Sequence, residues 1–435
     1  MKRLAAAGVA ILALAALLHA LSPLKEYSTE YVASCNAKFA LDLYAKLAAE
    51  NSGNVFVSPY SVSTALAMTW AGALGDTAEK MGNVLHYPSN SDAVHPGVGA
   101  LMRELESRTG VKGVRLGVAN RLYGNTGEPF RPEFLALVDK CYAGGLERVN
   151  FAGDPEGSRK NINNWVEKKT EDRIKDLLVR GDITPMTKLA LVNAIYFKGD
   201  WKDKFDKKLT VDGIFTNDGG RRSRDIRPLV PMMKRTGTMR YLKGEGFAAV
   251  ELPYVGDALS MVVFLPDDVG GLGEFEKKLT AENLAAWLKG FAEREFVNLS
   301  LPKFKMTIRY GSMENTLAAM GLPLSGDFSG MTTGGPLSIS KIIHKAFVDV
   351  NEEGTEAAAA TAVIMKRGPA PKPVEFTADH PFLFLIRDVK TGAILFMGRL
   401  TDPTATEGAA ALADPKPVGL PRSPKIPPPD RAVGG

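Results

Sequence analysis

Residues 351–369 read NEEGTEAAAATAVIMKRGP and combine a cleavable bond with little structural preference. The run of four alanines favours helix, whereas the β-branched residues that follow it favour strand. Lys366 and Arg367 are residues after which trypsin-like proteases cut. The prolines beyond them disfavour both helix and central strand. This composition is typical of a segment that a protease attacks as a substrate.

Residues that could catalyse a reaction are few. The chain has five histidines, and no H-E-x-x-H, C-x-x-C, P-loop or G-x-S-x-G pattern occurs. His344 or His380 could join a serine in a hydrolytic triad, but a lone histidine is far more often a hydrogen-bonded structural residue. We therefore expect no enzymatic activity, no cofactor and no metal site.

Composition leaves the partner class open. The chain has 435 residues with 45% hydrophobic content, enough for one large domain or two ordinary ones. The net charge of +5 is spread along the chain, and the basic run 221–227 is interpreted as a solvated loop, so we expect no nucleic-acid partner. Cys35 and Cys141 form either one disulfide or two separate thiols, and the sequence leaves both readings open.

The N-terminus carries an export pattern. Lys2 and Arg3 precede an unbroken apolar run from Ala5 to Leu21, the charged and apolar regions of a signal peptide. No clean cleavage site follows, so residues 1–24 are a signal peptide or an uncleaved membrane anchor. Either reading predicts an extracellular or other extracytoplasmic location, with membrane contact only if the segment is uncleaved.

Helical spacing of apolar residues predicts helices in the first half of the chain, over 36–50, 58–73 and 155–178. The second of these opens with serine as a cap and proline in its first turn. At the other end, residues 403–435 are rich in proline and poor in apolar bulk, which predicts a disordered tail.

Strand patterns dominate the rest of the chain. Residues 188–201 are apolar at nearly every position, which predicts a strand buried on both faces. Further strands are predicted within 239–266, 296–308 and 380–400, the last a hairpin that turns at Thr391–Gly392. Because helices come first and strands follow with interspersed helices, the fold class is α+β.

Several separated segments together resemble one family, the serpins, which are serine protease inhibitors. They occur in the serpin order and read NVFVSPYSVSTALAM, LVNAIYFKGDW, VELPY…LSMVVFLP, LPKFK, DFSGM, HKAFVDVNEEGTEAAAATA and DHPFLFLIRDVKTGAILFMGRL. The resemblance covers about residues 31–402. It implies three β-sheets, about nine helices and an exposed reactive loop that contains residues 354–372.

The resemblance also implies a mechanism, suicide inhibition of a protease. The protease attacks the loop and forms an acyl-enzyme, and the cut loop then enters the central sheet as a new strand. The tethered protease is carried along, which distorts its triad and oxyanion hole before the ester is hydrolysed. The implied partner is a target protease in a covalent complex, and the inhibitor itself is expected to be a monomer.

Small side chains suit a loop that later becomes a central strand. The hinge implied by the resemblance is Glu352, Glu353, Gly354, Thr355, Glu356, Ala357, Ala358, Ala359, Ala360 and Thr361. On insertion, one face would carry the uncharged residues Thr355, Ala357, Ala359, Thr361, Val363 and Met365. About ten new backbone hydrogen bonds would favour insertion by on the order of 10 kcal/mol. Non-inhibitory relatives tend to carry proline, charge or bulk here, so an active inhibitor is favoured.

Two counts of the loop place the scissile bond differently. The family's usual span, begun at Glu352, ends at Gly368 and would make the bond Gly368–Pro369. A loop one residue shorter places it at Arg367–Gly368, which suits a trypsin-like enzyme with an acidic specificity pocket. We predict Arg367–Gly368, with Lys366 as the second trypsin-like choice. Cleavage at Met365 or Ile364 would instead direct the loop to chymotrypsin-, elastase- or subtilisin-like enzymes.

Two further groups carry over by motif. Ser58, Ser61, Asn193 and His344 match the family's hydrogen-bond cluster beneath the centre of the main sheet, called the shutter. Trp201, Lys303 and Glu352 match the breach, the region where insertion begins, and a Lys303–Glu352 ion pair is expected there. The alternatives to a trypsin-like target are an inhibitor of subtilisin-, elastase- or papain-like proteases and a non-inhibitory serpin that acts as a carrier or chaperone.

Overall fold

The computed structural model describes residues 27–89, 91–142, 145–217, 229–291, 294–355 and 372–406. Several expectations fall outside these residues: the export segment, the basic run, the hinge from Glu356 onward, the scissile bond and most of the proline-rich tail. None of the helices within these ranges has the length and apolar content needed to cross a membrane.

The described residues contain nine α-helices and two short 3₁₀ helices. They are α2 (Thr29–Glu50), α3 (Pro59–Trp70), α4 (Gly75–Val84), α5 (Ser91–Ser107), η1 (Arg108–Gly110), α6 (Pro132–Tyr142), α7 (Pro155–Lys169), η2 (Lys207–Leu209), α8 (Leu272–Lys277), α9 (Ala281–Gly290) and α10 (Met313–Ala319).

Local signals set where the helices begin and end. Ser58 caps α3 by accepting a hydrogen bond from the Ser61 backbone amide, with Pro59 in the first turn as predicted. The helix predicted over 155–178 ends earlier, at Lys169. Glu171 and Asp172 take positive φ angles of 50° and 58°, which turn the chain away from the helix axis.

The strands follow the predicted positions in the second half of the chain and add others in the first. They are β1 (Val55–Val57), β2 (Val114–Asn125), β3 (Leu146–Val149), β4 (Leu189–Asp200), β5 (Val211–Ile214), β6 (Leu229–Gly244), β7 (Phe247–Pro253), β8 (Leu259–Pro266), β9 (Arg294–Pro302), β10 (Phe304–Tyr310), β11 (Lys341–Asn351), β12 (Gly354–Thr355), β13 (Val374–Thr377), β14 (Phe382–Asp388) and β15 (Ile394–Leu400). The predicted hairpin joins β14 to β15, and Gly392 takes the positive φ of 79° at its turn.

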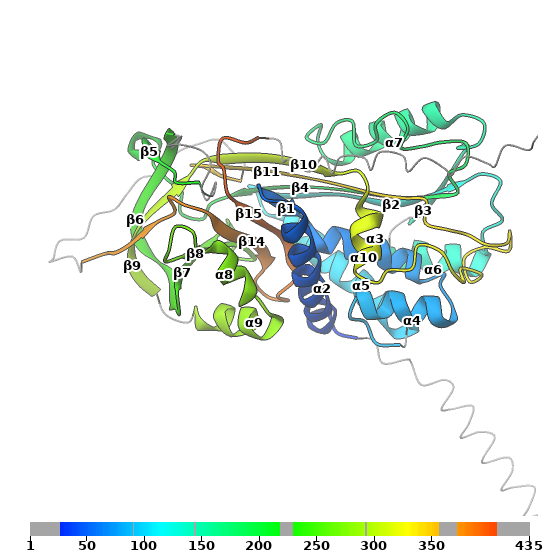
Figure 1. The fold of residues 1–435 in the computed structure, drawn as a ribbon, viewed down its shortest axis with the longest axis horizontal. Coiled ribbons are helices and arrows are strands. Elements are labelled where there is room, and N and C mark those ends of the chain that lie inside the picture. The colour runs from blue at the N-terminus through cyan, green and yellow to red at the C-terminus, as the bar shows by residue number, and fades with distance from the viewer. Residues whose placement is uncertain are drawn as a thin grey trace, which may run out of the picture.

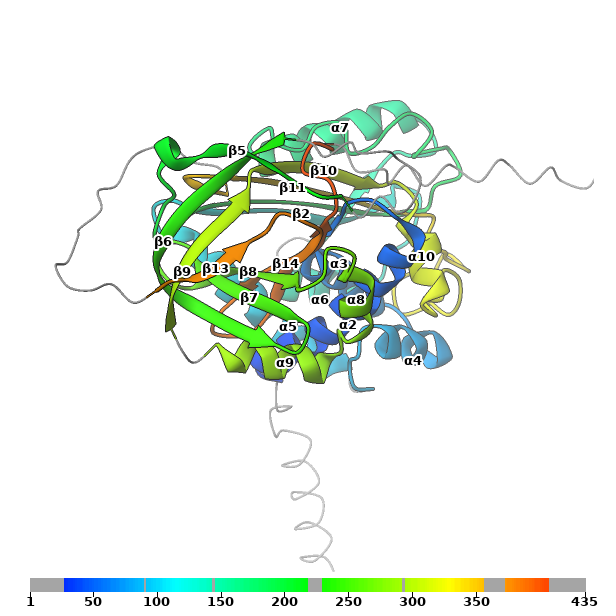
Figure 2. The same ribbon diagram turned by 60° about the vertical axis from the view of Figure 1, so that its left-hand side comes forward.

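Hydrogen bonding among the described residues joins these strands into a nine-stranded and a six-stranded sheet. The former runs β1-β15-β14-β8-β7-β6-β9-β13, with β5 beside β6, and the latter runs β10-β11-β12-β4-β2-β3. Long β6 links two layers of the nine-stranded sheet, since its first part pairs with β5 and β9 and its end pairs with β7 (Figure 2). Its continuity explains why two hydrogen-bonded sheets stand where three were expected.

The six-stranded sheet is the central layer of the molecule. Helix α7 covers one face, while the nine-stranded sheet and the other long helices lie on the opposite side (Figure 1). Strand β4 is buried on both faces, as predicted. Its residues alternate, because Val192 and Ala194 pack in the cluster under α7 whereas Leu191 and Ile195 pack in the main core. The α+β class is confirmed.

The two cysteines are thiols in the structure and no disulfide joins them. Cys35 on α2 is 3% exposed and Cys141 at the end of α6 is 5% exposed. Burial raises the pKa of the Cys35 thiol, which lowers its thiolate fraction further.

We predict that a thiol reagent such as dithionitrobenzoate modifies neither cysteine in the native protein and modifies both after denaturation. Because no bridge contributes to stability, adding dithiothreitol should leave the thermal midpoint unchanged. A midpoint that drops on reduction, or an intact mass that rises by two hydrogens, would contradict the thiol assignment.

Candidate functional site

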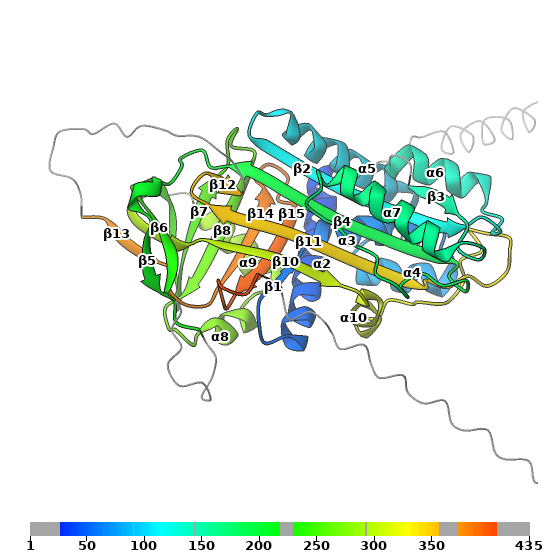
Figure 3. The ribbon, with the colours of Figure 1, turned by 90° about the horizontal axis from the view of Figure 1, so that it is seen from above.

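The segment that enters the predicted reactive loop is already part of the central sheet. After β11 the chain turns at Glu352 and Glu353, and β12 runs back antiparallel to β11, with Val350 opposite Thr355. On its other side β12 pairs antiparallel with β4, with Thr355 opposite Gly199. Beyond this point β4 and β11 pair directly and in parallel, from Lys341 opposite Ala190 to Phe347 opposite Tyr196. Strand β12 therefore separates β4 from β11 at one end only, and Figure 3 shows both long strands along the sheet.

The backbone at Gly354 leaves no room for a side chain. Its φ is 154°, and a Cβ there would lie 2.0 Å from the Gly199 carbonyl oxygen and 2.6 Å from the Asp200 Cα. The sequence indicated glycine as a source of hinge freedom, and the structure adds a second requirement, the close approach of two backbones.

Side chains from two segments, Lys204 to Thr210 and the link between β9 and β10, hold the turn between β11 and β12. Glu352 is 4% exposed and its carboxylate lies 2.9 Å from Lys303 Nζ, so the predicted ion pair is present. The Thr210 hydroxyl donates to the same carboxylate at 2.8 Å. Glu353 pairs with Lys204 at 3.0 Å and with Lys207 at 2.8 Å. Two adjacent buried carboxylates are thus neutralised by three lysines.

Backbone and aromatic contacts complete this end of the sheet. The Trp201 indole donates to the Asn351 carbonyl at 2.9 Å, and its backbone amide donates to the Glu353 carbonyl at 2.9 Å. The Trp201 ring stacks on Tyr254 with centroids 4.7 Å apart. The Tyr254 and Thr355 hydroxyls lie 2.9 Å apart in the core, so Thr355 is satisfied although it is fully buried.

Electrostatics favour the ionised form of Glu352. Burial alone would raise the pKa of this carboxyl, but the hydrogen bond from Lys303, the backbone and Thr210 together hold it below its usual range. The turn is consequently ionised and paired at neutral pH, and breaking the pair would leave a buried charge.

A second cluster lies under the middle of the central sheet. His344 on β11 is fully buried, and its Nδ1 contacts the Asn193 side-chain oxygen on β4. The Ser58 backbone amide lies 3.1 Å from His344 Nε2. The Ser58 hydroxyl donates to the Leu395 carbonyl at 2.6 Å, which ties the start of α3 to β15. This network joins β4, β11, α3 and β15 at one point.

Asn120 on β2 extends the cluster, and the sequence had not singled it out. Its side-chain oxygen accepts from the Ser61 hydroxyl at 2.6 Å and from the Asn193 amide at 2.9 Å, while its own amide donates to the Ser61 carbonyl at 3.1 Å. No motif marks an asparagine inside a strand. Its cross-strand register with Asn193 reveals the role.

The hydrogen bonds determine the state of His344. A backbone amide can only donate, so Nε2 is the bare nitrogen that accepts from Ser58, and Nδ1–H donates to Asn193. Burial lowers the pKa of His344 to about 3. The imidazole is neutral at physiological pH, and a proton on Nε2 would break the bond to Ser58.

The structure brings most of the described site residues into two groups. Ser58, Ser61, Asn193 and His344 meet under the sheet, and Trp201, Lys303 and Glu352 meet at its end with Glu353 to Thr355. The rest of the predicted hinge, together with Arg367 and Gly368, lies outside the described residues. Sequence reasoning missed five polar side chains that complete these groups, namely Asn120, Lys204, Lys207, Thr210 and Tyr254. His380 is structural, with Nε2 bonded to the Pro266 carbonyl at 2.8 Å.

We predict that His344 makes stability depend on pH between about 6.5 and 3. The unfolded chain binds a proton near pH 6.5 and the native state only near 3, so stability falls as pH falls through this window. Between pH 7.5 and 5.5 the loss from this residue should be about 1.4 kcal/mol.

Urea denaturation of wild type and His344→Gln at both pH values measures this term. His95, another buried histidine whose pKa is lowered to about 4 by burial, contributes equally to both proteins and cancels. The variant should be less stable at pH 7.5 but should lose about 1.4 kcal/mol less on acidification. Equal losses in the two proteins would refute the prediction.

Comparisons with known proteins agree with this architecture. The family model described as serpin (serine protease inhibitor) matches residues 34–403. Human leukocyte elastase inhibitor is 43% identical over 390 residues, covering 86% of this chain and all of the relative, and serpin B6 of Pongo abelii is 41% identical over 383 residues with the same coverage. Among solved structures, uncleaved ovalbumin superposes with a TM-score of 0.75 at 30% identity, covering 86% of this chain and all of that one.

A second similar structure was solved with a ligand bound. Human thyroxine-binding globulin, in complex with its ligand, superposes with a TM-score of 0.77 at 27% identity and covers 87% of this chain. The fold implied by the sequence motifs is confirmed by these likenesses. The chain belongs to the serpins, a family of serine protease inhibitors and not of enzymes.

Proposed function

We propose that this protein is a suicide-substrate inhibitor of a trypsin-like serine protease. One observation carries the inhibitory part of the proposal, the position of β12, and the basic residue Arg367 suggests the target. Thr355 already lies between β4 and β11, uncharged and fully buried. The residues after it therefore need only to continue an existing strand to enter the sheet.

The chemistry follows from the loop and from the place it would enter. We call this place the seam, the line along which β4 and β11 pair directly. The protease serine attacks the Arg367 carbonyl carbon, the bond to the Gly368 nitrogen breaks, and that nitrogen leaves with a proton from the protease histidine. Arg367 remains esterified to the serine. Continued pairing along β4 and β11 replaces their direct contact and carries the ester with the moving strand. Distortion of the protease oxyanion hole then prevents hydrolysis.

The two polar groups have distinct proposed roles. The Lys303–Glu352 group, at the end of the sheet, acts as the breach and fixes the point at which the loop enters. The His344 network, under the direct pairing of β4 and β11, acts as the shutter and holds the strands together until cleavage. Both have buried polar atoms with partners on several elements, which supports a closed seam that opens only when insertion replaces its bonds.

A second candidate target is an elastase-like protease. It is favoured by one relative at 43% identity, which is a leukocyte elastase inhibitor. The loop also contains Ile364 and Met365, which suit such enzymes. We retain Arg367 as the first choice, because a basic residue followed by glycine matches an acidic specificity pocket.

The remaining proposals concern the chain as a whole. Residues 1–24 direct export or anchor the protein, residues 31–402 form the inhibitor domain, and residues 403–435 are a proline-rich tail. The charged and apolar pattern before residue 24 supports export. The inhibitor acts as a monomer towards its protease.

Mixing with trypsin tests the target. We predict a complex stable on denaturing gels and a released C-terminal peptide that begins at Gly368. Arg367→Ala should slow complex formation about 30-fold or more, because it removes the charge that fills the specificity pocket. Lys366→Ala, the matched removal of the neighbouring charge, should form the complex at close to the wild-type rate.

The other outcomes are equally specific. A complex with elastase but not with trypsin would transfer the proposal to the second candidate. Cleavage without complex, followed by no gain in thermal stability of the cut protein, would reject inhibition and leave a carrier or chaperone role.

We further predict that Glu352→Lys opens the end of the sheet. The substitution places a fourth cation beside Lys303, Lys204 and Lys207 in a buried site, and it should destabilise the native state by about 3 to 5 kcal/mol. Gently heated protein should then form loop–sheet polymers, visible on native gels, while wild type stays monomeric.

Two variants control for charge alone. Glu245→Lys makes the same change on an exposed turn and should behave as wild type. Lys303→Glu combined with Glu352→Lys restores an ion pair with reversed polarity and should recover part of the lost stability. A monomeric, fully inhibitory Glu352→Lys protein would remove the breach role from Glu352.

A further inference from the structure

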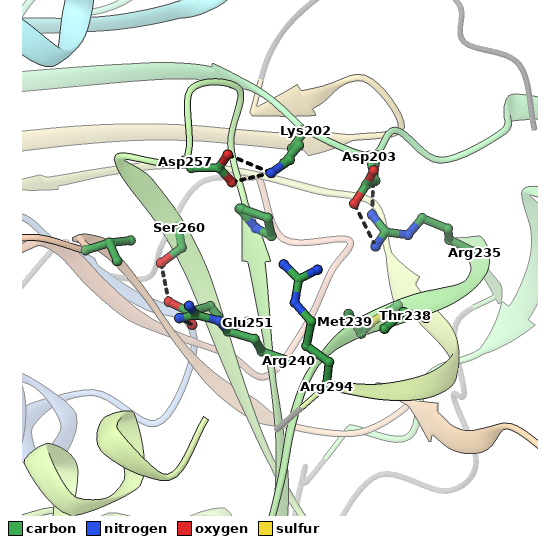
Figure 4. Close-up of a pocket in the computed structure, with 12 residues that line it drawn as sticks. Lys202, Asp203, Arg235, Thr238, Met239, Arg240, Glu251, Asp257, Ser260 and Arg294 are labelled. Carbon is green, nitrogen blue, oxygen red and sulfur yellow. Dashed lines mark hydrogen bonds and ion pairs between the residues drawn. The ribbon is translucent and has the colours of Figure 1, made fainter. Parts of the chain in front are cut away.

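A cleft of about 510 Å³ opens beside β6, β7 and β9 and reaches Lys202 and Asp203, which follow Trp201 at the end of the central sheet. Seven of its twelve lining residues are charged, four basic and three acidic. Lys202, Arg235, Arg240 and Arg294 line the cleft together with the acidic residues Asp203, Glu251 and Asp257 (Figure 4). Its volume is within the range of small-molecule sites.

Each acidic side chain of the cleft already has a basic partner. Asp257 holds Lys202 at 2.6 Å, and Asp203 lies 3.5 Å from Arg235, whose side chain is only 12% exposed. Arg240 pairs with Glu251 at 2.9 Å. These ion pairs fix the positions of three of the basic side chains. They also leave no lining carboxylate without a basic partner.

Glu251 is shared with a further cation. Arg387, on β14, binds the same buried carboxylate at 2.7 Å, and the Ser260 hydroxyl donates to it at 2.7 Å. One carboxylate thus pairs with two guanidinium groups. The lining residues carry four positive and three negative charges, and Arg387 adds a further positive charge beside them.

Arg294 is exposed and forms no ion pair with the residues that the structure describes. It begins β9 and lies directly opposite Arg240 on β6. Like charges at directly paired positions of two strands destabilise a sheet. Among the described residues no acidic group lies within ion-pair distance of Arg294, and its guanidinium points into the middle of the cleft (Figure 4). A second arginine beside Arg240, with no acidic partner in the described part of the chain, is suited to an anion from solution.

We propose that this cleft binds a small multivalent anion with phosphate or carboxylate oxygens. Arg294 and Arg240 supply planar guanidinium donors, which match such oxygens in pairs. Lys202 and Arg235 form the edge of the site, where their acidic partners hold them in place. The ligand would neutralise the Arg240–Arg294 repulsion and so bind the folded state in preference to the unfolded one. The site shares no residue with the breach or the shutter.

Titration of the full chain with pyrophosphate and with citrate at constant ionic strength tests the site. Calorimetry should detect one equivalent bound, and the thermal midpoint should rise with ligand concentration. Binding of pyrophosphate alone would assign the site to phosphates and binding of citrate alone to polycarboxylates, and either result supports the proposal.

Arg294→Gln provides the decisive variant because it touches no described ion pair. Without ligand its thermal midpoint should equal or exceed that of wild type, since a repulsion is removed. Its affinity for the anion should fall about ten- to hundredfold. Arg180→Gln removes the same charge from an exposed residue in the loop after α7 and should bind as wild type does.

Three results would overturn the proposal. They are absence of binding of both anions to wild type, unchanged affinity in Arg294→Gln, and an equal loss in Arg180→Gln, which would reduce the effect to net charge. Protease inhibition is not part of the readout, so the proposed function and this site fail independently.

Discussion

The parallel pairing of β4 with β11 is the interaction on which the rest of the structure depends. Parallel central strands that are buried on both faces ordinarily stay paired, because their hydrogen bonds and packing are not exposed to solvent. Here the pairing is interrupted at one end by β12, a strand of two residues, and is intact from Lys341 to Phe347. An interrupted seam can exchange one set of backbone bonds for another at little cost per step, which lets an antiparallel strand extend between the two.

The side chains around this seam are polar, although buried apolar side chains would stabilise the fold more. Buried ion pairs and hydrogen-bonded networks cost desolvation and bring little net stability, but they demand one geometry. The Glu352 pair fixes the turn before β12, and the His344 network fixes β4 and β11 where they pair directly. In the proposed mechanism, both would define one closed arrangement without adding so much stability that insertion of a complete strand becomes unfavourable.

Features set by residues adjacent in the chain could be predicted from this sequence, whereas features set by cross-strand geometry could not. The serine–proline start of α3, the two-faced burial of β4 and the turn at Gly392 follow from residues adjacent in the chain, and each was predicted. The end of α7 was not, because the positive φ angles of Glu171 and Asp172 depend on how the following segment packs. The membership of Asn120 in the His344 network and the opposition of Arg240 and Arg294 depend on strand register, which single positions do not reveal.

The sequence by itself determined the fold class, the family and the residue types of the site, because apolar periodicity and a series of ordered motifs are properties of the chain. It also indicated the Lys303–Glu352 ion pair, through motifs 49 residues apart. Only the tertiary structure decided that Thr355 already lies within the sheet, that three lysines neutralise two adjacent carboxylates, and that the cysteines remain thiols. These facts depend on distances between segments far apart in sequence, which are set by the packing of the whole domain.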